Sequence, residues 1–118
     1  MPRLPSVLVV DDDEDIRDVV EDLLSDRGFE IRQASSLDEA RRELSARDFD
    51  TLLCRIEFLR SADPEFLPGP PAGATRPRIR VVAMSAGDAY ALRDEADANL
   101  AKPFTRRELL AALRPAGA

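Results

Sequence analysis

The 118-residue chain contains no histidine and only one cysteine, Cys54. The absence of histidine removes the commonest general base and metal ligand of enzymes. A single cysteine excludes an intrachain disulfide. Because Cys54 lies in an apolar run, we expect it to be a buried small hydrophobic residue. No signal peptide is visible, and no apolar run approaches transmembrane length. We therefore expect a cytoplasmic protein that is not an enzyme.

Basic residues are outnumbered, 17 against 23 acidic ones, which gives a formal net charge of −6. Nonspecific nucleic-acid binding and attachment to anionic membranes both depend on clustered positive charge. Here the basic residues form only short pairs such as Arg41-Arg42 and Arg106-Arg107. This argues against nucleic acid and membranes as partners. The length and the 44% apolar content suit one domain over residues 1–118.

Short apolar runs alternate with segments of helical periodicity along the chain. Strands are predicted at Val7–Val10, Phe29–Ala34, Thr51–Cys54 with Ile56, Arg78–Met84 and Asn99–Ala101. Helices are predicted from the acids Asp11–Asp15 to a stop at Gly28, from the capping box Ser36/Glu39, at Glu57–Phe66, at Gly87–Ala98 and from the capping box Thr105/Glu108. Segment 68–77 holds four prolines and two glycines and cannot be helical.

This alternation predicts an α/β fold, a single doubly wound five-stranded parallel sheet with helices on both faces. The third and fourth helices should be shortened or irregular, because the Pro/Gly-rich loop 68–77 limits one and small and acidic residues fill the other. In such sheets, ligands bind outside the carboxyl ends of the strands. Five polar residues fall at or just past those ends, namely Asp11, Asp12, Arg55, Ser85 and Lys102.

Three motifs in this order resemble those of response-regulator receiver (CheY-like) domains, which act in two-component phosphorelay signalling. They are Val7–Asp13, Ser85-Ala86 and Lys102–Phe104, and the resemblance covers essentially the whole chain. It implies the flavodoxin-like order of the sheet. It also implies that an acidic pair, Asp11 and Asp12, holds Mg²⁺, an oxygen-seeking cation, and that Ser85 and Lys102 contact a phosphoryl group carried by an aspartate after the third strand. Pro103 occupies a position that is usually cis in the family.

The third strand departs from the family pattern. Counting from Asp50 places Arg55 at the phosphoacceptor position, whereas a slip of two residues would place Glu57 there. The anchor at Asp50 favours Arg55, and Glu57 then stands where the family offers a backbone carbonyl to the metal. With arginine in place of a carboxylate, the family's pocket charge of −2 becomes zero. We expect Arg55 to pair with Asp11 or Asp12 in place of Mg²⁺, so that metal binding is weak or absent; the alternative is that Arg55 turns to solvent.

Other positions depart from the family as well. Asn99 occupies the switch position, where the family has an aromatic residue. The loop after the acceptor is replaced by Glu57–Arg60, and the segment between Ser85 and Lys102 is several residues short. These changes together predict an atypical pseudo-receiver with a degenerate phosphorylation pocket and no cofactor.

The main functional hypothesis is a receiver domain that acts through phosphorylation-independent protein contact. Its predicted surfaces are the face of helix 87–98, strand 99–101 and the last helix, or the flank of the short helix 57–66, where a thin cover would expose apolar sheet. Homodimerisation is possible. The alternative is a conventional receiver phosphorylated on Glu57 or Asp50, and a remote one is a haloacid-dehalogenase-like phosphatase. The chain ends too soon after the last helix to hold an output domain.

Overall fold

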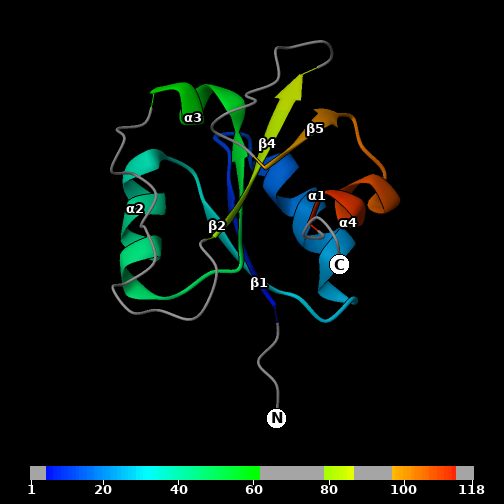
Figure 1. Cartoon of the computed structure of the whole chain (residues 1–118), viewed down its shortest axis with the longest axis horizontal. Helices are drawn as coiled ribbons and strands as arrows, with labels where there is room; N and C mark the ends of the chain where they lie inside the picture. The colour runs from blue at the N-terminus through cyan, green and yellow to red at the C-terminus, as the bar shows by residue number, and fades with distance from the viewer. Residues whose placement is uncertain (1–4, 62–78, 87–96, 114–118) are drawn as a thin grey trace.

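The computed structural model describes residues 5–61, 79–86 and 97–113, which form a sheet with helices on both sides (Figure 1). The elements in chain order are β1 (Ser6–Val10), α1 (Glu14–Ser25), β2 (Glu30–Ala34), α2 (Leu37–Ala46), β3 (Thr51–Arg55), α3 (Ile56–Ser61), β4 (Arg80–Ala86), β5 (Ala98–Lys102) and α4 (Arg106–Leu113). None of the described helices has the length and apolar character needed to cross a membrane.

All five strands are parallel and follow the order β2-β1-β3-β4-β5. This order confirms the doubly wound α/β fold predicted from the sequence. The direction of winding reverses at β1 and β3, and such a switch point leaves a crevice at the carboxyl edge of the sheet. Cys54 pairs with Val10, so the residues that follow both strands emerge side by side at that crevice.

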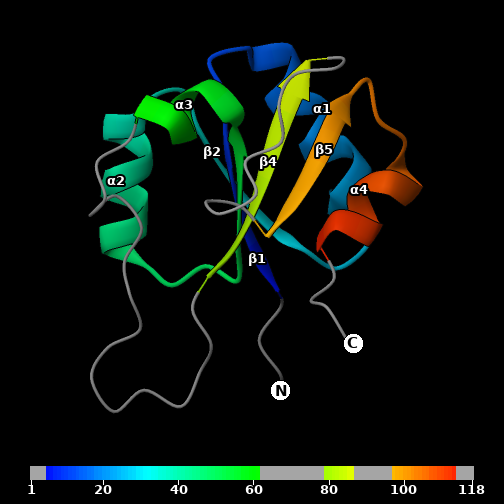
Figure 2. The ribbon, with the colours of Figure 1, turned by 45° about the horizontal axis from the view of Figure 1, so that its top comes forward.

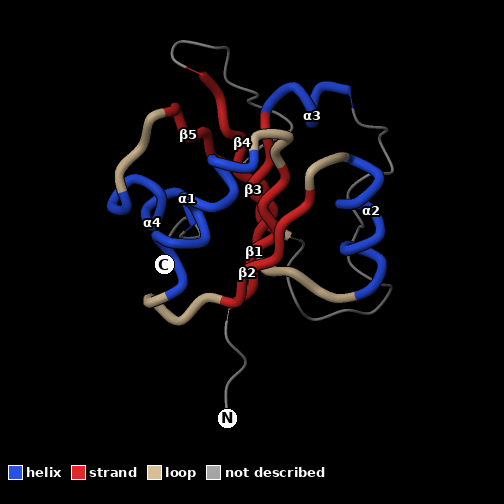
Figure 3. The backbone as a smooth tube through the Cα atoms, turned by 180° about the vertical axis from the view of Figure 1, so that it is seen from behind, coloured by secondary structure: helices blue, strands red, loops and turns tan. Residues whose placement is uncertain are grey.

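The central strands β1, β3 and β4 are buried on both faces, because their side chains point alternately to the two sides of the sheet and helices cover both sides. Leu8 and Val10 belong to one core cluster, with Ile56 and Leu59 of α3 and Ala40 of α2. The other core packs β1 through Val7 and Val9 against Val20 and Leu24 of α1 and Leu109 and Leu113 of α4. Seen from behind, α1 and α4 flank one side of the sheet and α2 and α3 the other (Figure 3).

Local capping fixes where the helices begin. The Asp13 carboxylate accepts the N–H of Asp15 at 2.9 Å and caps α1. The capping box before α4 is complete, because Thr105 and Glu108 each accept the other's backbone N–H. At α2 the capping box is modified. Ser36 Oγ accepts the backbone N–H of Glu39, but the Glu39 carboxylate accepts the backbone N–H of Ser35 instead of that of Ser36.

The order of the described elements was predicted correctly, but several boundaries were wrong. Ile56 begins α3 and does not extend β3, since an apolar residue alone does not separate a strand from a buried helix. The strand β4 runs on through Ser85, which therefore lies in the strand and not past it. Ala98 opens β5 and so cannot end a helix at 87–98. The rest of that helix, residues 62–66, the loop 68–77 and Arg78 lie outside the described residues.

The expected exposure of apolar sheet beside the short third helix is not found in the described residues. Ile56 and Leu59 of α3 are buried, as are the β3 and β4 side chains beneath them. The one large hydrophobic side chain that is exposed in the described ranges is Val19, at 45%, on α1. The apolar feature of the surface therefore lies on the opposite side of the sheet.

Candidate functional site

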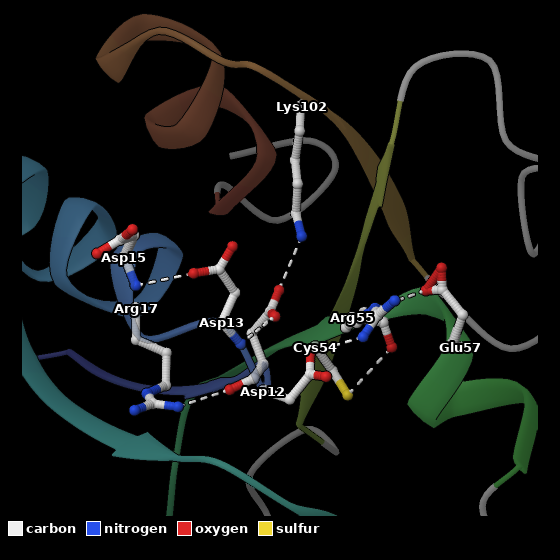
Figure 4. Close-up of polar contacts among 9 residues, drawn as sticks. Asp12, Asp13, Asp15, Arg17, Cys54, Arg55, Glu57 and Lys102 are labelled. Carbon is white, nitrogen blue, oxygen red and sulfur yellow. Dashed lines mark hydrogen bonds and ion pairs between the residues drawn. The ribbon is translucent and has the colours of Figure 1, made fainter.

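A cleft of about 320 Å³ opens at the carboxyl edge of the sheet, as expected for this strand order. Figure 4 shows how its polar side chains converge from the β1–α1 loop, the β3–α3 junction and the end of β5. Its lining residues are Asp11, Asp12, Asp13, Arg55, Glu57, Met84 and Lys102. Segments far apart in sequence are thus brought to one site.

Asp11 is the buried anchor of the cleft. Its side chain is 1% exposed, and one carboxylate oxygen accepts the Lys102 ammonium at 2.8 Å. The other oxygen accepts the backbone N–H of Asp13 at 2.9 Å. A buried carboxylate is tolerated only when it is paired and hydrogen-bonded, and both conditions are met here. The Lys102–Pro103 peptide is cis, at the position where the family resemblance implied it.

Arg55 ends β3 and points into the cleft, while Glu57 lies in α3 (Figure 4). The two-residue slip considered from the sequence is therefore not found. The Arg55 Nη1 donates to Asp12 Oδ1 at 2.6 Å and its Nε donates to Glu57 Oε2 at 2.9 Å. The guanidinium does not turn to solvent; it bridges two carboxylates from different segments.

The Arg55–Asp12 contact perturbs both partners electrostatically. The hydrogen bond from Arg55 lowers the pKa of the Asp12 carboxyl below its usual value, and the same bond raises the pKa of Arg55. Asp12 therefore stays ionised to a lower pH, and Arg55 stays protonated to a higher pH, than the isolated side chains would. Cys54, next to Arg55, is buried, and the loss of solvation raises the pKa of its thiol. The expectation of an inert buried cysteine is consistent with this environment.

The charge count made from the sequence was incomplete. Asp13 and Glu57 also line the cleft, so four carboxylates face two cations and the formal charge is −2, not zero. Each of the four carboxylates nevertheless already has a partner. Asp11 is paired with Lys102, Asp12 and Glu57 are paired with Arg55, and Asp13 caps α1. Within the described ranges, no three acidic or thiol side chains are grouped so as to hold a metal ion. In this arrangement the residues do not fit Mg²⁺, because each carboxylate of the cleft that could bind the metal already contacts a cation or caps α1.

Three other residues named from the sequence lie elsewhere. Ser85 is buried inside β4, with Ala101 of β5 as its neighbour in the sheet, and is not among the residues that line the cleft. Asn99 is exposed on β5. Asp50 precedes β3 at the opposite edge of the sheet, where its carboxylate accepts the N–H of Ser6 at 2.8 Å.

Arg17 is a supporting residue that the sequence reading missed. Its Nη1 donates to the backbone carbonyl of Asp11 at 2.8 Å (Figure 4), and its Nε donates to Gln33 of β2 at 3.0 Å. Arg17 thus ties the β1–α1 loop to the edge strand and orients the acidic residues. The only signal in the sequence is its place one turn after the acids in α1, which by itself predicts only a solvated arginine.

Comparison with known proteins agrees with this geometry. The family model of the response regulator receiver domain matches residues 7–114. No curated protein matches the chain. The chain belongs to the response regulator receiver family, whose members act in two-component signalling and interact with protein partners.

Solved structures support the same assignment. The signal receiver domain of an HD domain-containing protein from Pseudomonas fluorescens Pf-5 is 26% identical, with a TM-score of 0.75; the match covers 97% of this chain and 87% of that one. A receiver domain protein from Clostridium thermocellum is 23% identical, with a TM-score of 0.71 and coverage of 93% and 91%. NtrX from Brucella abortus is 28% identical, with a TM-score of 0.70, and this chain spans 25% of its length.

Proposed function

We propose that this receiver domain is a pseudo-receiver that signals through protein contact without accepting a phosphoryl group. The observation that carries the proposal is the ion pair of Arg55 with Asp12, at 2.6 Å, at the end of β3. The family resemblance places the phosphoacceptor aspartate at this position. A guanidinium there offers no oxygen to phosphorylate, and it occupies a carboxylate that Mg²⁺ would need.

The arrangement also supports a signalling state that is fixed in advance. In a receiver that is phosphorylated, metal and phosphoryl charge bring the segments around the pocket together. Here Arg55 links the β1–α1 loop to α3, and Lys102 links the same loop to β5. The side chains of Arg55 and Lys102 thus supply the links that the metal and the phosphoryl group would otherwise supply. The domain accordingly presents one surface to its partner whether or not a phosphodonor is present.

The proposed partner is a protein in the cytoplasm, and the proposed docking surface is the β5–α4 face. Mg²⁺ binding is proposed to be weak or absent, and no enzymatic activity is assigned. The phosphatase alternative has no support in the family match, which is to receiver domains over residues 7–114. Hydrolysis of a generic phosphate ester by the purified chain would restore it.

Treatment with acetyl phosphate and MgCl₂, followed by intact-mass spectrometry, tests the proposal. We expect the mass of the protein to stay unchanged, while a conventional receiver domain in the same reaction gains one phosphoryl group. The Arg55→Asp variant, which restores a carboxylate at the end of β3, provides a second comparison. A phosphorylated wild-type protein would refute the proposal.

The competing function is phosphorylation on another carboxylate. Of the two candidates, Asp50 is separated from the cleft by the length of β3, about 16 Å at the rise of a parallel strand. Glu57 lines the cleft and its side chain is 49% exposed, so it is the stronger candidate. If wild-type protein is phosphorylated and Glu57→Gln protein is not, the competing function is correct.

A further inference from the structure

The helices α1 and α4 lie side by side on one face of the sheet (Figures 1 and 2). The outer surface of this pair carries Val19, whose side chain is 45% exposed although it belongs to the apolar periodicity of α1. Single exposed hydrophobic residues are common and need no explanation by themselves. The charges around Val19, however, form an ordered pattern.

One half of this pattern is acidic. Asp15 precedes Val19 by four residues, and Asp22 and Asp26 follow it by three and seven, so that all of them lie along one side of α1 and its C-cap. Asp26 marks this side as the one next to α4, because its carboxylate lies 4.0 Å from Arg106. We call Asp15, Val19, Asp22 and Asp26 the acidic stripe.

The other half is basic. A groove of about 430 Å³ is lined by Arg27, Arg106, Arg107, Leu110 and Ala111, which we call the arginine groove. Within the described ranges, Arg27 and Arg107 make no ion pair, and the Arg106 contact to Asp26 is long. The Nε of Arg106 is buried without a hydrogen-bond partner among these residues. Little is therefore lost if these guanidinium groups turn to other carboxylates.

We propose that this face docks a second copy of the chain through a two-fold interface. In an isologous dimer the same patch is used by both copies, so it must be complementary to itself. A face that is acidic along α1 and basic along α4 meets this requirement: a two-fold rotation sets the acidic stripe of each copy against the arginine groove of the other. Val19 and Leu110 then supply the apolar centre that a stable interface needs.

The dimer should be weak. At 1.5 Å per residue, α1 is about 18 Å long and α4 about 12 Å. This limits the face to less than the roughly 800 Å² per copy of a standard interface. The net charge of −6 on each copy also opposes association, although at physiological ionic strength charges more than about 8 Å apart are screened. Association is expected only at concentrations from about 10 μM to 1 mM.

Sedimentation equilibrium of the full chain at these concentrations tests the proposal. We expect a reversible monomer–dimer equilibrium for the wild type. The double variant Arg106→Glu/Arg107→Glu should weaken it at least about 100-fold, because like charges would then face each other. Arg41→Glu/Arg42→Glu, with the same charge change on α2, is the matched control and should dimerise as the wild type does. Circular dichroism confirms that each variant is folded.

A charge swap makes the test specific for a second copy. Asp15→Lys/Asp22→Lys protein should be monomeric alone, since two basic surfaces then meet. Mixed with Arg106→Glu/Arg107→Glu protein, it should form a heterodimer, because each reversed patch then faces its complement. A wild-type chain that stays monomeric to about 1 mM, or two variants that fail to associate when mixed, would overturn the proposal. In that case the arginine groove would be open to an acidic segment of a different protein.

Discussion

Replacing Arg55 by glutamine isolates the effect of its positive charge on the cleft. Glutamine keeps a polar, though shorter, side chain and carries no positive charge that would repel a cation. If Arg55 takes the place of Mg²⁺, the Arg55→Gln protein should bind Mg²⁺ more tightly than the wild type. The substitution also releases Asp12 and Glu57, both of which line the cleft and now bind the guanidinium.

The size of the effect follows from Coulomb's law. A unit charge about 4 Å from a divalent cation repels it by about 2 kcal/mol in water and by about 8 kcal/mol at an effective dielectric constant near 20. The Arg55 side chain is 35% exposed, so the lower value applies. It corresponds to an affinity about 30-fold higher for the Arg55→Gln protein.

Titration of isotope-labelled protein with MgCl₂, followed through the backbone amide signals of Asp12 and Asp13, measures the two affinities. Arg32→Gln is the control, because Arg32 also pairs with a carboxylate, Glu43, but on the β2–α2 side of the molecule. The control should bind Mg²⁺ as weakly as the wild type. If Arg55→Gln protein binds Mg²⁺ no more tightly than the control, the argument that the guanidinium replaces the metal is wrong.

Three further predictions concern stability and reactivity. Because Arg55 lowers the pKa of Asp12, the pair stabilises the fold above the ordinary aspartate pKa of 3.8 and loses this effect as the pH falls through the lowered pKa; the difference in thermal stability between wild-type and Arg55→Gln protein should therefore vanish in strong acid. Lys102→Met leaves the buried Asp11 carboxylate without its cation and should lower the free energy of unfolding, measured in urea, by about 3 kcal/mol. Adding Asp11→Asn should recover part of that loss, and simple additivity would contradict the pairing. Burial raises the pKa of the Cys54 thiol, so Ellman's reagent should modify Cys54 only after unfolding; rapid reaction of the native protein would show that the thiol is accessible.

The central strands β1, β3 and β4 were found from the sequence because a strand buried on both faces needs a continuous apolar run. The helices were harder to bound. Ile56 continues the apolar run of β3 yet begins α3, since burial in a helix and in a strand makes the same demand on a side chain. Val19 fits the apolar periodicity of α1 but is exposed, which periodicity alone does not predict.

The sequence by itself determined that Asp11, Asp12, Arg55 and Lys102 would meet, because the ends of parallel strands lie at one edge of a sheet and the spacing of the runs sets those ends. It could not assign the partners. Only the tertiary structure decided that Lys102 takes the buried Asp11 while Arg55 takes Asp12 and Glu57, and that Ser85 stays inside β4. These pairings depend on how deep each side chain lies and where it points. The packing of the helices against the sheet sets both, and the order of the residues does not.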